Sequence, residues 1–288
     1  MVTQQRAPQP TPAPDRNPRK SFEVLGVRIN AIQIPEVLET LRQWIAAGER
    51  GRYIAVTGMH GVTEAQHDRQ FKKVLNAADL TVPDGMPLVW LGRLRGFNLK
   101  RRVYGPELML AVCNATAKIG LRHFFYGATP STLESLTAAL TRRSPELEIA
   151  GMIAPPFREL TPAEDREVVA QINEARPDIL WIGLSTPKQE RWMYDHRDRL
   201  NVAAMIGVGA AFDIHAGRTK QAPAWMREHG LEWFFRLIQE PRRLWRRYLV
   251  YGGEFIFLIA RDYLRSPANS RLKATPAPLH RSDTLKSD

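Results

Sequence analysis

The sequence predicts an α/β fold in which a mostly parallel sheet carries helices on both faces and a basic helical appendage follows. Short apolar runs alternate with longer amphipathic ones, which is typical of strand–helix units. The apolar runs are nearly continuous, as expected of strands that are buried on both faces. From Trp225 onward the sequence becomes aromatic and basic, which indicates a helical segment lying on the core and not more sheet.

Seven apolar runs are the expected strands, and amphipathic segments between them are the expected helices. In chain order the strands are 22–27 (FEVLGV), 53–57 (YIAVT), 80–82 (LTV), 123–126 (HFFY), 149–153 (IAGMI), 179–182 (ILWI) and 203–208 (AAMIGV). Helices are expected where apolar residues recur every third or fourth position, at 34–47, 62–76, 105–119, 131–142 and 162–175. Pro241 indicates a new helix start within the appendage.

Changes in composition divide the 288 residues into four parts. Residues 1–20 and 266–288 are rich in proline and charge without an apolar period, so we expect a disordered arm and a disordered tail. Residues 21–224 form the α/β core and residues 225–265 the helical appendage.

Composition also limits the class of protein. Lys and Arg number 41 against 30 Asp and Glu, a formal charge of +11, and Cys113 is the single cysteine. One cysteine excludes a disulfide framework and a cysteine-built metal site. No run approaches the ~20 apolar residues of a spanning helix, and we expect no secretion signal. The sequence therefore indicates a cytoplasmic protein whose positive charge meets a nucleotide, a nucleic acid or an anionic membrane.

Ligands of such folds bind outside the carboxyl ends of the strands, so the residues after each apolar run are the candidates. Asp84 follows the third run. A carboxylate there is either an N-cap of the next helix, the more frequent role, or a general base. Gly127 follows the fourth run and precedes a hydroxyl-rich helix start, which suits a phosphate or ribose but equally an ordinary turn with a capping box from Ser131 to Glu134. The dinucleotide fingerprint G-x-G-x-x-G is missing, which disfavours NAD.

The sixth and seventh runs end in similar candidates. Lys188 and Gln189 begin the helix after the sixth run, where a lysine gains nothing from the helix dipole and thus indicates an anionic ligand or a solvated turn. Gly209 and Asp213 lie in the small-residue stretch GVGAAFDIHAG, which suits close approach to a nucleotide or a tight packing turn.

The appendage carries arginines among aromatic residues. Arg243, Arg246 and Arg247 share one helical face, and such a helix suits an anionic membrane, single-stranded nucleic acid or solvent over an aromatic core. The histidines show no metal-binding spacing, and no D-x-D pair follows a strand. We expect no metal and no cofactor, so any diphosphate handled here must be met by protein cations.

Several blocks of sequence resemble one family in order. They are VPDGMPLVW, RVYGPELM, FFYGATPSTLESL, PDILWIGLSTPKQERWM and GVGAAFDIHAGRTKQAPAWMREHGLEWFFRLIQEPRRLWRRYL. From about Phe22 to Leu264 the chain resembles the WecB/TagA/CpsF glycosyltransferases (glycosyltransferase family 26, N-acetylmannosaminyltransferase-like).

The resemblance implies a Rossmann-like core and a hexosyltransferase that moves N-acetylmannosamine, glucose or a similar sugar from UDP to an undecaprenyl-diphosphate-linked acceptor. It implies inverting, metal-independent chemistry in cell-surface or exopolysaccharide synthesis, on the inner face of the plasma membrane. Asp84 would be the catalytic base, with arginines Arg236, Arg243 and Arg247 on the diphosphate and Arg246 close by. Uridine would lie near Gly127, Gly183, Gln189 and Gly209.

One position departs from the family. Many members carry T-x-N after the second run, whereas here Met59 stands at the Asn position. Thr57 is kept, and His60 is the candidate for part of the missing role. We expect no nucleic-acid partner and allow a homo-oligomer. A nucleic-acid-binding protein and a nucleotide-dependent oxidoreductase are the alternative functions.

Overall fold

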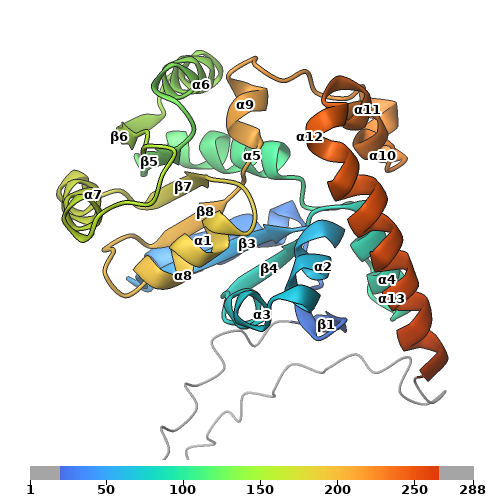
Figure 1. The fold of residues 1–288 in the computed structure, drawn as a ribbon. Coiled ribbons are helices and arrows are strands. Elements are labelled where there is room, and N and C mark those ends of the chain that lie inside the picture. The colour runs from blue at the N-terminus through green and yellow to red at the C-terminus, as the bar shows by residue number, and fades with distance from the viewer. Residues whose placement is uncertain (1–19, 266–288) are drawn as a thin grey trace, which may run out of the picture.

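A six-stranded parallel sheet forms the centre of the computed structural model, which describes residues 20–265 (Figure 1). Every strand pairing within this sheet is parallel, in the order β4-β3-β8-β7-β5-β6. The strands are β3 (Arg52–Thr57), β4 (Leu80–Pro83), β5 (Arg122–Gly127), β6 (Glu148–Ile153), β7 (Ile179–Gly183) and β8 (Ala204–Gly207). The predicted parallel sheet is confirmed.

Helices cover both faces, as the sequence predicts. Successive strand residues point to opposite faces, so Ile54 and Trp181 belong to one buried cluster and Tyr53 and Leu180 to the other. The first face is covered by α1 (Ile34–Ala46), α5 (Gly105–Ala117), α6 (Pro130–Arg143) and α9 (Ala211–His215). The second is covered by α2 (Met59–His67), α3 (Arg69–Asn76), α7 (Pro162–Ala175) and α8 (Lys188–His196).

The chain connections change direction between the neighbouring strands β5 and β7, since β5 leads outward to β6 and β7 leads the other way to β8. These strands are neighbours, yet α6 after β5 and α8 after β7 pack on opposite faces. Such a switch opens a crevice at the carboxyl ends of the strands, where ligands of open α/β sheets bind.

The predicted strand 22–27 is wrong. It is an antiparallel hairpin of β1 (Ser21–Val24) and β2 (Val27–Asn30), separate from the main sheet. Leu25 and Gly26 form its turn with φ of 53° and 77°, the left-handed pair that closes a tight hairpin.

Two further local predictions need correction. The expected helix 62–76 is divided at Asp68, whose carboxylate accepts the Phe71 N–H (2.9 Å) and caps α3. The N-cap of α6 is Thr129, which accepts the Thr132 N–H, and not Ser131. The expected arm and tail lie outside the described residues except for Lys20, whose carbonyl accepts the Ala31 N–H.

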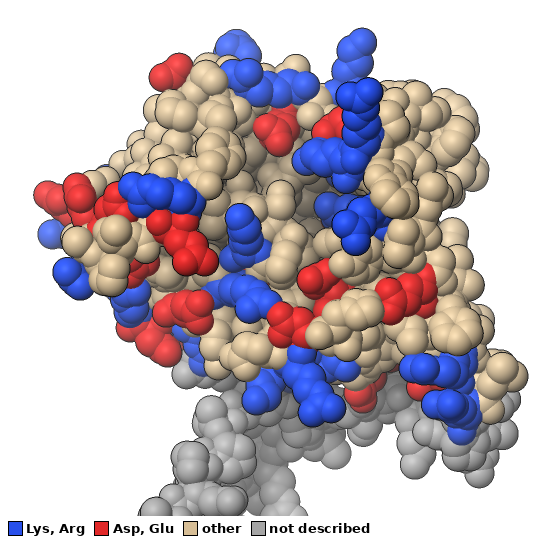
Figure 2. Space-filling model, in the orientation of Figure 1, with Lys and Arg blue, Asp and Glu red and all other residues tan. Residues whose placement is uncertain are grey.

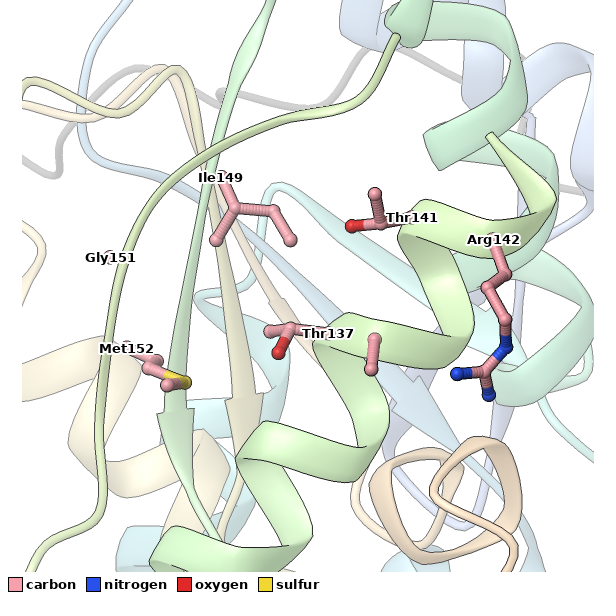
Figure 3. Close-up of a pocket in the computed structure, with 7 residues that line it drawn as sticks. Thr137, Thr141, Arg142, Ile149, Gly151 and Met152 are labelled. Atoms are coloured by element: carbon pink, nitrogen blue, oxygen red, sulfur yellow. The ribbon is translucent and has the colours of Figure 1, made fainter. Parts of the chain in front are cut away.

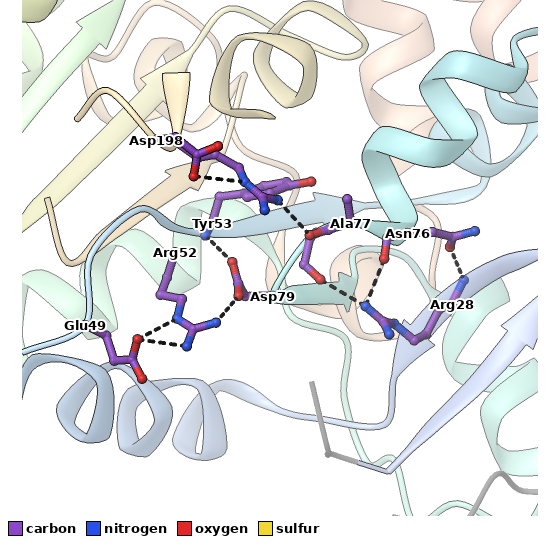
Figure 4. A network of polar contacts seen from close by, with 10 residues as sticks. Arg28, Glu49, Arg52, Tyr53, Asn76, Ala77, Asp79 and Asp198 are labelled. Carbon is purple, nitrogen blue, oxygen red and sulfur yellow. Dashed lines mark hydrogen bonds and ion pairs between the residues drawn. The ribbon is translucent and has the colours of Figure 1, made fainter. Parts of the chain in front are cut away.

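A polar network fixes the amino ends of the strands (Figure 4). Arg52 pairs with Asp79 (2.6 Å) and Glu49 (2.8 Å), and Asp79 also accepts the Tyr53 N–H. Arg28 of the hairpin donates to the Asn76 and Ala78 carbonyls at the end of α3. All these groups have partners and lie at the opposite end of the strands from the candidate site, so we read the network as structural.

The carboxyl-terminal residues are helical, and Pro241 begins a helix as predicted. They form α10 (Ala224–Glu228), α11 (Glu232–Gln239), α12 (Pro241–Trp245), a π-helix η1 (Arg246–Val250) and α13 (Tyr251–Arg265). In Figure 1 this segment runs down one side of the core, and α13 packs along α2. Among residues 20–265 there is no helix both long and apolar enough to cross a bilayer.

Candidate active site

Asp84 stands directly after β4 at the carboxyl edge of the sheet. Its N–H donates to the Thr57 carbonyl (2.7 Å), which ties the ends of β4 and β3 together. The N-cap of α4 (Met86–Leu94) is Gly85, with no side-chain capping bond and a φ of 144° that favours glycine. The helix-cap interpretation of Asp84 is therefore wrong.

The carboxylate of Asp84 is partly exposed and has an oxygen without a hydrogen-bond partner. Its side chain is 31% exposed, so a substrate can reach it, yet Oδ1 is buried without a hydrogen-bond partner. Arg102 Nη1 lies 3.9 Å away. Burial raises the pKa of Asp84 to about 6, against the opposing charges of Arg102, Arg247 and Arg236. A carboxyl group with such a pKa suits proton transfer near neutral pH.

Other buried polar atoms without partners come from elements around Asp84. Buried polar groups in proteins are almost always hydrogen-bonded, so a set of exceptions indicates a ligand site. The atoms are Thr57 Oγ1, His60 Nδ1, Gln189 Oε1, Glu190 Oε2 and Arg236 Nε. Four of these five residues were singled out in the sequence, namely Thr57, His60, Gln189 and Arg236.

His60 is held neutral. It lies in the first turn of α2, where its ring packs on Tyr251 of α13 with centroids 5.0 Å apart. Burial, and then the charge of Arg247, lowers the pKa of His60 to about 3. A neutral imidazole both donates and accepts hydrogen bonds, which suits sugar hydroxyls.

Two appendage arginines act electrostatically on Asp84. The charges of Arg236 from α11 and Arg247 from η1 act on the Asp84 carboxyl group, and Arg247 also acts on Glu190. Burial lowers the pKa of Arg247, although an arginine stays charged. Figure 2 shows a hollow in this face, with Lys and Arg side chains where Figure 1 has α11 and α12.

The other two predicted arginines lie farther out. Arg243 is 58% exposed and pairs with Glu240, while its charge acts on Asp213 of α9, whose pKa burial raises. Arg246 is exposed, and its charge acts on Tyr251.

The ends of β5, β7 and β8 form the remaining wall. Gly127 has a φ of 128°, and a Cβ there would lie 2.6 Å from the Gly183 carbonyl oxygen, so these neighbouring strand ends leave no room for side chains. Gly209 passes beside Gln189 Oε1, and Gln189 Nε2 donates to Glu190 (3.0 Å). Lys188 is exposed at the start of α8.

The sequence analysis missed Arg102, Glu190 and Glu232. Arg102 pairs with the buried Glu232 of α11, which also accepts the Tyr104 hydroxyl. Glu190 is fully buried and accepts the Thr186 hydroxyl (2.8 Å). Glu190 lies inside the block PKQE, and that was its signal. Arg102 carries no such signal because its partner is 130 residues away.

A second hollow lies elsewhere, between α6 and β6 (Figure 3). Thr137, Thr141 and Arg142 line it from the helix, and Ile149 and Met152 line it from the strand. Because β6 and β4 are opposite edges of the sheet, this hollow is separate from Asp84. No group of three or more His, Cys, Asp or Glu side chains that could hold a metal occurs within residues 20–265.

Comparison with known proteins identifies the family. The model of the glycosyl transferase WecG/TagA/CpsF family matches residues 22–269. An N-acetylglucosaminyldiphosphoundecaprenol N-acetyl-beta-D-mannosaminyltransferase of Bacillus subtilis is 33% identical over 63% of this chain and 69% of its own length. Enzymes of the same description from Bacillus spizizenii (30% identical, 69% and 76%) and Staphylococcus aureus (26% identical, 81% and 90%) are also similar. The chain belongs to the WecG/TagA/CpsF family of glycosyltransferases.

Proposed function

We propose that this enzyme transfers a sugar, N-acetylmannosamine, glucose or a similar hexose, from a UDP-sugar to an undecaprenyl-diphosphate-linked acceptor. The names of the relatives support the acceptor class. The observation that carries the proposal is the Asp84 carboxylate, which is unsatisfied, lies 3.9 Å from Arg102 and feels the charges of Arg236 and Arg247 from the appendage. A base for an alcohol and cations for a diphosphate are the two requirements of this reaction.

Asp84 activates the acceptor. The exposed part of its carboxylate accepts the hydrogen of an acceptor hydroxyl and takes the proton as the hydroxyl oxygen bonds to the anomeric carbon of the donor and UDP leaves. Arg102 lies 3.9 Å away and keeps a positive charge beside the carboxylate. Thr57 and His60 offer further hydrogen bonds to the two sugars.

Arg236 and Arg247 stabilise the departing diphosphate. Negative charge on UDP grows as the glycosidic bond breaks, so guanidinium groups aimed there bind the transition state more tightly than the ground state. Arg243, beside Asp213, would add positive charge near the diphosphate from a more exposed position. The exposed Lys188 and Arg246 would attract the anionic substrates from solvent. This proposal assigns no role to a metal or a cofactor. With one base and one leaving group, the reaction is a single displacement that inverts the anomeric centre.

The carboxyl ends of β5, β7 and β8 would hold uridine. Gly127 and Gly183 let these strand ends lie close together, and Gly209 passes beside Gln189 Oε1, an unused acceptor for the N–H of a uracil ring. The nucleotide would then cross the switch point between β5 and β7.

The appendage would lie on the inner face of the cytoplasmic membrane. It exposes large apolar side chains next to its arginines, the composition of an interfacial helix. These are Trp233, Phe234, Trp245, Ile256 and Phe257. The active site would thus open toward the lipid-linked acceptor.

Incubation of the purified chain with UDP-N-acetylmannosamine or UDP-glucose and lipid-linked N-acetylglucosamine diphosphate tests the function. We expect UDP release that requires the acceptor, and a product heavier by one sugar with the anomeric configuration opposite to that of the donor. We also expect the rate to survive a chelator. A product with the donor's configuration contradicts the single displacement, and a panel of UDP-sugars without turnover contradicts the function.

The pH profile should report Asp84. The raised pKa of about 6 means that the carboxyl group is protonated below pH 6 and cannot accept a proton. We expect kcat/KM to fall about tenfold per pH unit below pH 6 and to level off above it, because the free-enzyme profile follows the base. Rates measured from pH 4.5 to 8.5 check this, and a flat profile would exclude Asp84 as the base.

A further inference from the structure

A cavity of about 440 Å³ has Arg102, the neighbour of Asp84, in its lining. Its walls come from α4, from the loop before α5, and from the region of α10. Among the described side chains, its lining holds five cations, Arg93, Lys100, Arg101, Arg102 and Arg227, and one carboxylate, Glu107. None of these residues belongs to the donor side described above except Arg102.

We propose that this cavity, the Lys100 cavity, binds the diphosphate of the lipid-linked acceptor. The inference rests on the proposed function and adds the position of the second substrate. The donor diphosphate is assigned to Arg236 and Arg247, so the acceptor needs cations of its own. In an acceptor such as N-acetylglucosaminyldiphosphoundecaprenol, the substrate named for the relatives, diphosphate and reacting hydroxyl belong to the same sugar ring. An anion site next to Arg102 therefore lies one sugar away from Asp84.

The cations of the Lys100 cavity are positioned before any ligand arrives. Arg93 donates to the Leu99 and Lys100 carbonyls, both at 2.6 Å. The Gln33 side-chain oxygen accepts the N–H groups of Lys100 (3.1 Å) and Arg101 (3.2 Å). These bonds fix the loop that carries three of the cations, Lys100, Arg101 and Arg102, and a preorganised site binds without the cost of loop ordering.

Two lining arginines are held by carboxylates, which keeps them in place. Arg227 pairs with Glu107, and its Nε is buried without a partner. Arg102 pairs with Glu232. Glu107 lines the cavity and Glu232 does not, so five cations face a single carboxylate and the net charge of the described lining is positive, as a diphosphate requires.

The rim of the Lys100 cavity is apolar. Trp90 is 48% exposed and Leu94, one turn farther along α4, is 71% exposed. Exposed tryptophan beside basic residues is typical of a membrane interface. A polyprenyl chain could leave the cavity over this rim, which favours a lipid-linked diphosphate over a free phosphate.

Lys100→Glu tests the proposal, and Lys118→Glu is the matched control. Lys100 and Lys118 are both exposed, and Lys118 follows α5 at the opposite end of the strands. The assays use two acceptors, an N-acetylglucosamine diphosphate with a short alkyl chain and an alkyl N-acetylglucosaminide without phosphate. We expect Lys100→Glu to raise KM for the diphosphate acceptor at least about tenfold, the effect of losing a charge-assisted contact. The KM for the UDP-sugar, the rate on the phosphate-free acceptor and all rates of Lys118→Glu should change less than about twofold.

Direct binding separates this proposal from the proposed function. Calorimetry with the diphosphate acceptor alone should show the same weakening in Lys100→Glu, and it needs no turnover. If the wild type binds this acceptor but transfers nothing, the proposed function fails and the site stands. An equal loss on both acceptors, or unchanged binding, overturns the site. Weaker binding to phosphatidylglycerol vesicles with an unchanged acceptor KM would assign the cavity to a lipid headgroup and also overturn it.

Discussion

Asp84→Asn should lower kcat by about 10²–10⁴ while the enzyme still binds both substrates, because the amide cannot accept the acceptor's proton. The substitution keeps the shape of the side chain. Turnover on saturating substrates measures the effect, and calorimetry with UDP verifies that the donor site is intact. An unchanged kcat would remove the general base from the mechanism.

The same variant should not lose stability at pH 8. The folded-state pKa of Asp84 is raised above the ordinary aspartate value, so the folded state binds the proton more tightly than the unfolded state does. The stabilisation from this proton is complete below about pH 4 and is lost as the pH rises through about 6. Asn avoids the burial of a negative charge, so its Tm at pH 8 should equal or exceed that of the wild type. A loss of both Tm and activity would instead indicate a structural role.

Arg247→Gln should lower kcat by about 10²–10³, the loss typical of removing one group that stabilises developing charge in a buried site. Arg247 is the appendage arginine whose charge reaches Asp84, His60 and Glu190 together. The KM for the UDP-sugar should change less than kcat, since the charge on the diphosphate grows only as the bond breaks.

Arg242→Gln is the matched control for that experiment. Arg242 is exposed on the preceding helix. Its replacement changes the charge of the appendage by the same amount as Arg247→Gln, but it removes no group that acts on Asp84. We expect its kcat on lipid-linked acceptor to stay within about threefold of the wild type, as for an exposed charge. Equal losses in both variants would assign the arginines to membrane attraction and contradict their action on the leaving group.

The sequence predicted most of the sheet because its strands are buried on both faces and so read as continuous apolar runs. It failed at the first strand, where Leu25 and Gly26 interrupt FEVLGV with a left-handed turn. A leucine in that conformation is uncommon, so the local sequence did not predict a turn at this position. The break at Asp68 was also not predicted. Aspartate is a common N-cap residue, but Asp68 lies within a continuous amphipathic stretch, which indicated one uninterrupted helix.

The site was predicted in parts. Asp84 and Gln189 follow apolar runs, and the rule that ligands bind at the carboxyl ends of strands was enough to find them, whereas Thr57 and His60 came from the resemblance. The association of Arg236 and Arg247 with the core came from the resemblance, since helical spacing alone placed Arg243, Arg246 and Arg247 together. Spacing also could not find Arg102 or Glu232, because their pairing depends on how the appendage packs on the loop before α5.

The π-helix η1 has a consequence for how the guanidinium of Arg247 is aimed. The Tyr251 N–H donates to the Arg246 carbonyl, five residues earlier, so this turn holds one residue more than an α-helical turn. Loss of a single residue here would restore ordinary winding and rotate the preceding helix by ~100° relative to α13. Arg247 would then point in another direction relative to α13, although its own side chain would be unchanged. The number of residues in this turn therefore matters for catalysis. It sets the rotation of α12 relative to α13, and with it the direction in which the guanidinium of Arg247 points.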